Sequence, residues 1–217
     1  MVIKLFHYVH CPFCLRIRMT LGYLGQQYES VVLPYDDENT PVDLTGKKML
    51  PIVSLGSKVI NESLDIMIEL DQDNRLKIRD TLAQENFKAF EELLSRIGSP
   101  VHSLAMPFWI WSPEFSDSSR NYFRAKKEIK RGPFKELVKN QATYADELFS
   151  VLASVETDLK PFYQSQDFTV RDILLAAHLW GVYSVPEFRL SDKLHSYLQS
   201  VKSICRFQYY EPLWEKL

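Results

Sequence analysis

The pattern of apolar and polar positions changes about one third of the way along the chain. Before that point, short β-branched and aromatic runs alternate with helical patterns. The runs typical of strands cover residues 2–8, 28–33, 52–55 and 58–60. Apolar residues at helical spacing predict a helix from Leu15 to Leu24, and the polar residues 61–63 are typical of a second helix start. Residues 36–41 are polar and predict a loop. The order β-α-β followed by β-β-α indicates an α/β domain.

Helical periods dominate the rest of the chain. Apolar stripes at helical spacing cover residues 83–97, 144–159 and 194–204. Gly98-Ser99-Pro100 predicts the end of the first of these helices. The charged stretch 71–75 is typical of a linker. We therefore expect two domains, an α/β domain over residues 1–72 and an all-helical domain over residues 80–217.

One helix of the second domain has a distinct signature. Thr169 and Asp172 have the spacing of a capping box, and residues 173–180 that follow are apolar on every side. A helix that is apolar all round is buried. We therefore expect His178, which lies in this run, to be a core histidine with satisfied hydrogen bonds rather than a ligand.

Composition narrows the possible classes. The chain has 217 residues, 46% of them hydrophobic and 25% charged, with a net charge of −2. This balance favours no general attraction to nucleic acid or to an anionic membrane. The basic run over residues 120–131 is best interpreted as a solvated helix face, and the aromatic stretch 106–111 as packing between domains, although it could line a pocket. With no signal peptide or membrane span predicted, we expect a soluble cytoplasmic protein.

Candidate chemistry is concentrated at Cys11-Pro12-Phe13-Cys14, directly after the first predicted strand. Three cysteines in 217 residues do not make a disulfide framework, so a CxxC pair indicates catalysis or metal binding. Cys11 is predicted at or just before a helix N-terminus, where N–H groups and the helix dipole stabilise a thiolate. Pro12 suits the first helical turn. Arg16 adds positive charge, and Cys14 lies close enough to resolve an adduct on Cys11.

The alternative is half of a zinc site. Zinc requires two further ligands at motif spacing, whereas the sequence offers only Cys205 and five scattered histidines. The pattern therefore favours redox chemistry, and no bound metal is expected.

Several segments together resemble known families. They are the CPFC motif, the Leu50-Pro51-Ile52 junction, the Glu62-Ser63 pair, the capping box, residues 33–51 and residues 120–128. The first three resemble the N-terminal domain of glutaredoxins and glutathione transferases. The whole set is similar to the glutaredoxin 2 family, bacterial glutaredoxins with a transferase-like architecture. The resemblance implies an α/β thioredoxin-like N-terminal domain plus an all-α glutathione-transferase-like C-terminal domain.

The same resemblance implies a glutathione site. Pro51 would be a cis-proline against the CxxC motif, and the backbone of Leu50 would pair with the cysteinyl part of glutathione. Glu62 and Ser63 would hold the γ-glutamyl end, a role that also suits a helix N-terminus facing an anion. Cys11 and Phe13 complete the expected site; Phe13 stands where tyrosine is common in the family.

The expected function is glutathione-dependent thiol–disulfide oxidoreduction, with Cys11 as nucleophile and Cys14 as resolving thiol. Glutathione is the expected reducing co-substrate, glutathionylated or disulfide-containing proteins are the expected partners, and the chain is expected to be a monomer. Two alternatives stay open, because fold does not fix function. One is a glutathione transferase that conjugates electrophiles, and the other is a non-catalytic module that binds glutathione or a metal.

Overall fold

A mixed four-stranded sheet forms the first part of the molecule. The structure is a computed structural model that describes residues 2–208. The strand order is β2-β1-β3-β4, with β1 (Ile3–His7) parallel to β2 (Tyr28–Val32) and antiparallel to β3 (Ile52–Leu55). The strand β4 (Lys58–Ile60) closes a hairpin with β3. The predicted strands and the α/β class of this part are confirmed.

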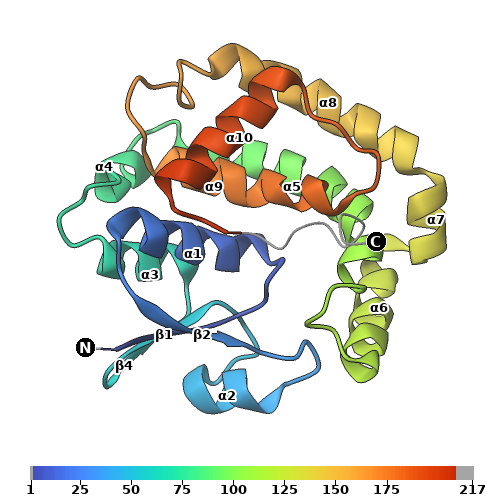
Figure 1. Cartoon of the computed structure of the whole chain (residues 1–217), viewed down its shortest axis with the longest axis horizontal. Coiled ribbons are helices and arrows are strands. Elements are labelled where there is room, and N and C mark those ends of the chain that lie inside the picture. Colours follow the sequence, from blue (N-terminus) through green and yellow to red (C-terminus); the bar gives the residue numbers. More distant parts are fainter. Residues whose placement is uncertain (1, 209–217) are drawn as a thin grey trace.

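Helices α1 (Pro12–Leu24) and α3 (Ser63–Leu70) pack together, with α1 forming the crossover between the parallel strands β1 and β2. Figure 1 shows α1 and α3 between the sheet and the helices α9 and α10, with α2 (Asn39–Thr45) away from them. The prediction of a loop over residues 36–41 was wrong at its C-terminal end, where α2 begins. The Asp37 carboxylate accepts a hydrogen bond from the Thr40 N–H at 2.9 Å, which supports this helix start.

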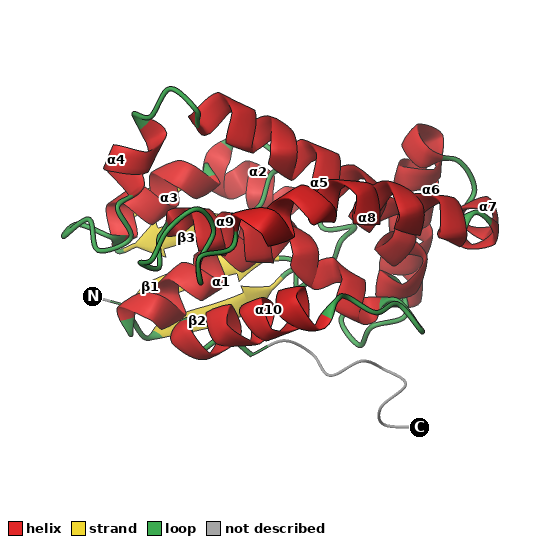
Figure 2. Cartoon of the chain, turned by 90° about the horizontal axis from the view of Figure 1, so that it is seen from above, coloured by secondary structure: helices red, strands yellow, loops and turns green. Residues whose placement is uncertain are grey.

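The second part of the described chain consists of helices, as expected. They are α4 (Ile78–Leu82), α5 (Phe87–Trp109), α6 (Asp117–Arg131), α7 (Phe134–Lys139), α8 (Gln141–Asp158), α9 (Val170–Leu179), the 3-10 helix η1 (Trp180–Ser184) and α10 (Asp192–Ile204). Figure 2 shows these helices layered over the sheet and its own helices. Among residues 2–208, no helix is both long enough and apolar enough to cross a membrane.

The predicted end of a helix at Gly98-Ser99-Pro100 was wrong. Helix α5 continues through this triplet to Trp109 and contains Pro100 and Pro107. A Cβ atom at Gly98 would lie 3.2 Å from Cδ2 of His178, so glycine allows α9 to approach closely here. The glycine therefore serves packing between helices and does not end the helix.

Helix α9 is the centre of the helical part. Both hydrogen bonds of the Thr169–Asp172 capping box are present, and every residue of α9 is buried, as predicted. The Nδ1 atom of His178 lies 2.9 Å from the Leu174 carbonyl oxygen, and burial lowers the pKa of His178 to about 4. His178 is therefore a neutral core histidine with a hydrogen-bond partner, which confirms the prediction.

The sheet side and the helical side share one continuous apolar core. Leu5 and Ile17 on one side and Ile97 and Leu174 on the other belong to a single cluster of buried side chains. Cys205 is fully buried in the same cluster and packs as a small hydrophobic residue, as expected. Burial of this shared surface holds the two parts together.

One backbone contact makes this packing testable. A Cβ atom at Gly22 in α1 would lie 1.8 Å from the carbonyl oxygen of Cys205 at the end of α10, so either the helix or the chain end would have to move. Glycine to alanine normally stabilises a helix interior by about 1 kcal/mol. We expect Gly22→Ala instead to lower the free energy of unfolding by about 1–3 kcal/mol, as overpacking does. Urea unfolding measures this.

Ser196→Ala, on the exposed face of α10, is the matched control and should change stability by less than about 0.5 kcal/mol. A Gly22→Ala variant as stable as the parent protein would contradict the contact.

Candidate active site

The CxxC motif lies where β1 turns into α1. Cys11 is the N-cap residue of α1, Pro12 occupies the first helical position, and Cys14 lies in the first turn. Cys11 is half-buried and Cys14 is fully buried, and both are free thiols. Because proline has no N–H and its φ angle suits a helix, Pro12 can start α1 directly after Cys11. The local sequence therefore leaves one thiol accessible and encloses the other.

The two thiols have opposite electrostatic environments. The pKa of Cys11 is lowered to about 7, mainly by a hydrogen bond from the Cys14 side chain. Burial opposes this effect, while the backbone N–H groups of Cys14 and Phe13 and the charge of Arg16 support it. The pKa of Cys14 is raised, first by burial and then by the neighbouring Cys11. At neutral pH, Cys11 is therefore partly thiolate and Cys14 keeps its proton.

Arg16 connects the thiol to the start of α3. Its side chain is buried, its guanidinium carbon lies 4.5 Å from the centre of the Phe13 ring, and one of its nitrogens donates to Ser63 Oγ at 3.3 Å. The guanidinium also acts electrostatically on Cys11. Positive charge therefore extends from the CxxC motif to the N-terminus of α3.

The residues predicted to bind glutathione lie on elements around this motif. The Leu50–Pro51 peptide bond is cis, as the resemblance implied. Leu50 packs in one apolar cluster with Cys14, and Pro51 is buried. Ser63 is the first residue of α3, and its N-cap Glu62 is exposed. Their roles toward glutathione stay a prediction.

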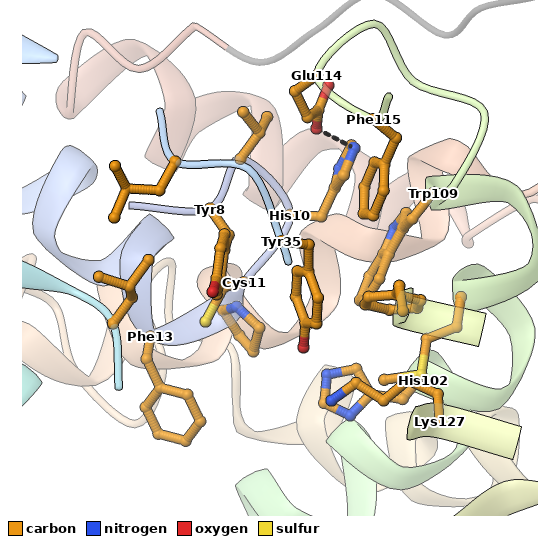
Figure 3. A pocket seen from close by; sticks show the side chains of 16 residues that line it. Tyr8, His10, Cys11, Phe13, Tyr35, His102, Trp109, Glu114, Phe115 and Lys127 are labelled. Atoms are coloured by element: carbon orange, nitrogen blue, oxygen red, sulfur yellow. Dashed lines mark ion pairs between the residues drawn. The ribbon is translucent and has the colours of Figure 1, made fainter. Parts of the chain in front are cut away.

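A pocket of about 250 Å³ opens beside Cys11, between the sheet side and the helical side. Figure 3 shows Cys11 on one wall, with His102 and Lys127 on the wall across from it. The lining residues are Tyr8, Val9, His10, Cys11, Pro12, Phe13, Leu33, Tyr35, Leu50, His102, Met106, Trp109, Glu114, Phe115, Phe123 and Lys127. Of the predicted site residues, Cys11, Phe13 and Leu50 line this pocket, whereas Cys14, Pro51, Glu62 and Ser63 do not.

A buried pair joins the two sides next to the pocket. The Nε2 atom of His10 lies 2.8 Å from a carboxylate oxygen of Glu114, and the two side chains are only 8% and 9% exposed (Figure 3). The His10 ring also stacks on Trp109. Burial favours the protonated acid, but the hydrogen bond and charge of His10 outweigh it and lower the pKa of Glu114. The pair therefore fixes the segment before Cys11 against the loop between α5 and α6.

Sequence reasoning missed most of this wall. The stretch 106–111 was assigned mainly to packing, with pocket lining as the alternative, and the run 120–131 to a solvated face, yet both Trp109 and Lys127 line the pocket. His102 and Glu114 were not identified at all. Lys127 is 116 positions from Cys11 along the chain, so no local motif connects them.

The hydrogen bond between the thiols predicts a specific titration. In the parent protein, the rate of Cys11 alkylation by iodoacetamide should rise with pH around a midpoint of about 7. Below that pH the thiolate is protonated and the rate falls. Cys14→Ala removes the largest stabilising contact, so its midpoint should move upward.

Cys14→Ser, which retains a hydroxyl donor, is the matched control. Its midpoint should lie between those of the parent protein and Cys14→Ala. Equal midpoints in the parent protein and Cys14→Ala would show that the thiol contact does not stabilise the thiolate.

Two family models match consecutive parts of the chain. Residues 5–77 match the N-terminal domain of glutathione S-transferase, and residues 89–212 match the C-terminal domain of glutaredoxin 2. Among the residues that the structure describes, no group of three or more histidine, cysteine or acidic side chains is placed to hold a metal ion.

Individual relatives agree with these models. Glutaredoxin 2 of Escherichia coli is 35% identical over 139 residues, which are 62% of this chain and 63% of that protein. The solved structure of glutaredoxin 2 from Salmonella typhimurium, in complex with glutathione, has a TM-score of 0.83 at 28% identity and covers 95% of this chain and 96% of that one.

The glutathione transferase GSTFuA3 of Phanerochaete chrysosporium shares the fold, with a TM-score of 0.77 at 17% identity over 97% of this chain and 99% of that one. The second family model alone spans more than half of the chain. The chain therefore belongs to the glutaredoxin 2 family.

Proposed function

We propose that this protein is a glutathione-dependent thiol–disulfide oxidoreductase that reduces glutathione mixed disulfides and protein disulfides through its CPFC pair. One arrangement carries the proposal: an accessible thiol caps the N-terminus of α1, and a buried thiol in the first turn hydrogen-bonds to it. This arrangement stabilises a nucleophile at neutral pH and places a second thiol within reach of it.

The chemistry proceeds by two exchanges at sulfur. The Cys11 thiolate attacks the glutathione sulfur of a mixed disulfide, the S–S bond breaks, and the target leaves as a thiolate that takes up a proton. A second glutathione thiolate then attacks the glutathione sulfur bound to Cys11, which releases glutathione disulfide and restores the Cys11 thiolate.

In the dithiol route, Cys14 supplies the second thiolate. Cys11 attacks a protein disulfide, and Cys14 loses its proton and attacks the Cys11 sulfur, which releases the reduced protein. Two glutathione molecules then reduce the Cys11–Cys14 disulfide and leave as glutathione disulfide. Burial, and then the neighbouring Cys11, raise the pKa of Cys14 and keep this thiol protonated in the resting protein. When an adduct forms, the Cys11 thiolate is gone, and with it the second of these two effects.

Glutathione would bind along Leu50 and the N-terminus of α3. In this proposal the Leu50 backbone, next to Pro51, pairs with the cysteinyl part, and Glu62 and Ser63 hold the γ-glutamyl end. Two observations support this: the free N–H groups at the start of α3 suit a carboxylate, and Arg16 brings positive charge to Ser63. The solved structure of Salmonella typhimurium glutaredoxin 2 is a complex with glutathione, which supports glutathione as the ligand.

We further propose glutathionylated or disulfide-containing proteins as partners, a monomeric state and a cytoplasmic location. The domain boundary between residues 72 and 80 also stays a proposal; this stretch covers most of the segment between α3 and α4 and the start of α4. A boundary there would leave the shared apolar core as the interface between the domains.

The cysteine variants separate the two routes. Cys11→Ser should lower glutathione-dependent turnover of a glutathionylated peptide by at least about 1,000-fold, because the attacking thiolate is removed. Cys14→Ser should retain turnover of this substrate, since the monothiol route needs only Cys11, but should lose reduction of a protein disulfide. Coupled assays with glutathione reductase measure both activities.

The same preparations test the main alternative. Conjugation of glutathione to an aryl halide, without disulfide reduction, would replace this proposal with a transferase. Full turnover by Cys11→Ser would exclude Cys11 as the nucleophile.

A further inference from the structure

Lys127 is a cation on the active-site wall with no acidic partner among the residues that the structure describes. It lies on α6, lines the pocket beside Cys11, and is half-buried. Its ammonium nitrogen lies 5.7 Å from the centre of the Tyr35 ring and 5.5 Å from that of Phe123. Within residues 2–208, it forms neither an ion pair with a carboxylate nor a hydrogen bond. A cation that lacks a counter-charge in a pocket is a candidate group for binding an anion.

The acidic residue that lines the pocket does not neutralise the charge of Lys127. Glu114 is held by His10 in the buried pair described above. Burial lowers the pKa of Lys127, the charge of Cys11 raises it, and the positive charges of Lys130 and Arg131 lower it further. Because no carboxylate among the described residues pairs with this partly desolvated ammonium, an incoming anion can do so.

His102 adds a second donor on the same wall (Figure 3). A guanidinium nitrogen of Arg131 lies 3.5 Å from His102 Nδ1, and because arginine only donates, Nδ1 is the acceptor. Burial lowers the pKa of His102 to about 3, so at pH 7 its single ring proton is on Nε2. The ring and the ammonium thus present two hydrogen-bond donors that an anion can share.

The rest of the wall selects a flat apolar group. Aromatic rings make up much of the pocket lining, and they are Tyr8, Phe13, Tyr35, Trp109, Phe115 and Phe123. Stacked and edge-to-face contacts with such rings favour an aromatic ligand. A pocket of about 250 Å³ has room for a single substituted ring.

We propose that Lys127, assisted by His102, is a specificity-determining residue for small mixed disulfides in which glutathione is joined to an aromatic thiol carrying an acidic group. This inference rests on the proposed function and names a substrate class for the same site. The Cys11 thiolate attacks the glutathione sulfur, the S–S bond breaks, and the aromatic thiolate leaves with the electron pair. Lys127 binds the acidic group of the leaving thiol, and a second glutathione regenerates Cys11 as above.

The test compares two substrates that differ in charge. In the anionic substrate, glutathione is joined to 5-thio-2-nitrobenzoate, whose ring carries a carboxylate. In the neutral substrate, glutathione is joined to pyridine-2-thiol, whose ring carries no acid, so the two names refer to the aromatic half. Both released thiols absorb light and can be followed directly. Lys127→Met should lower kcat/KM for the anionic substrate about tenfold and for the neutral one less than about twofold, since the charge contact is lost only with the former.

Two further variants separate charge from structure. Lys127→Arg keeps the charge and should retain most of the preference for the anionic substrate. Lys130→Met makes the same change in net charge at an exposed position one turn along α6 that does not line the pocket, and it should leave the preference unchanged. An equal loss on both substrates, or no loss, in Lys127→Met would overturn the inference.

A binding measurement separates this inference from the proposed function. Trp109 lines the pocket, so 2-nitrobenzoate should quench tryptophan fluorescence with a dissociation constant about tenfold weaker in Lys127→Met. If the parent protein reduces neither disulfide but binds nitrobenzoate through Lys127, the proposed function fails and the anion site stands. If it reduces both without dependence on Lys127, the function stands and the anion site fails. Absence of both turnover and binding would overturn both.

Discussion

The hydrogen bond from the Cys14 thiol to the Cys11 sulfur is the interaction on which the site depends. It is the largest contribution that lowers the pKa of Cys11, and it exists only while Cys14 keeps its own proton. Burial supplies that condition, because Cys14 lies in an apolar cluster with Leu33, Leu50 and Ile52. The apolar surroundings of Cys14 therefore stabilise the thiolate of Cys11. Without that cluster, burial would no longer raise the pKa of Cys14, and the two thiols would differ less.

The helical part completes this environment and gives the pocket its shape. Helix α1 packs against α9 as well as α3, and the pair of His10 and Glu114 joins the CxxC segment to the loop before α6. The segment after β2 is held in the same way, since Lys48 donates to the Tyr122 hydroxyl at 2.7 Å and the Tyr35 N–H donates to Ser119 at 3.0 Å. Separating the buried pair of His10 and Glu114 would leave its charges uncompensated, and moving the second segment would break its hydrogen bonds, so these contacts restrict how far the walls can move.

Whether a feature could be predicted from the sequence depends on how far apart its interacting residues lie along the chain. The CxxC helix start and the capping box of Thr169 and Asp172 depend on neighbours within four residues, and both were predicted correctly. Gly98 was misinterpreted because its role depends on the His178 ring, which lies 80 positions away. Lys127 was assigned to solvent because a basic helix face has the same pattern whether or not one of its members faces a pocket. Periodicity identifies helices and does not reveal which partner each face meets.

The separation between Lys127 and Cys11 follows from the demands of thiol exchange. A thiol reacts fastest when its pKa is close to the ambient pH, because a lower pKa reduces nucleophilicity and a higher one reduces the thiolate population. The thiol of Cys14, the N–H groups of α1 and Arg16 already bring Cys11 to about 7, against the opposing effect of burial. A second cation in direct contact would lower the pKa further and weaken the nucleophile. Placed across the pocket, Lys127 perturbs that balance less than a cation in direct contact would, and its charge is directed to the group that departs.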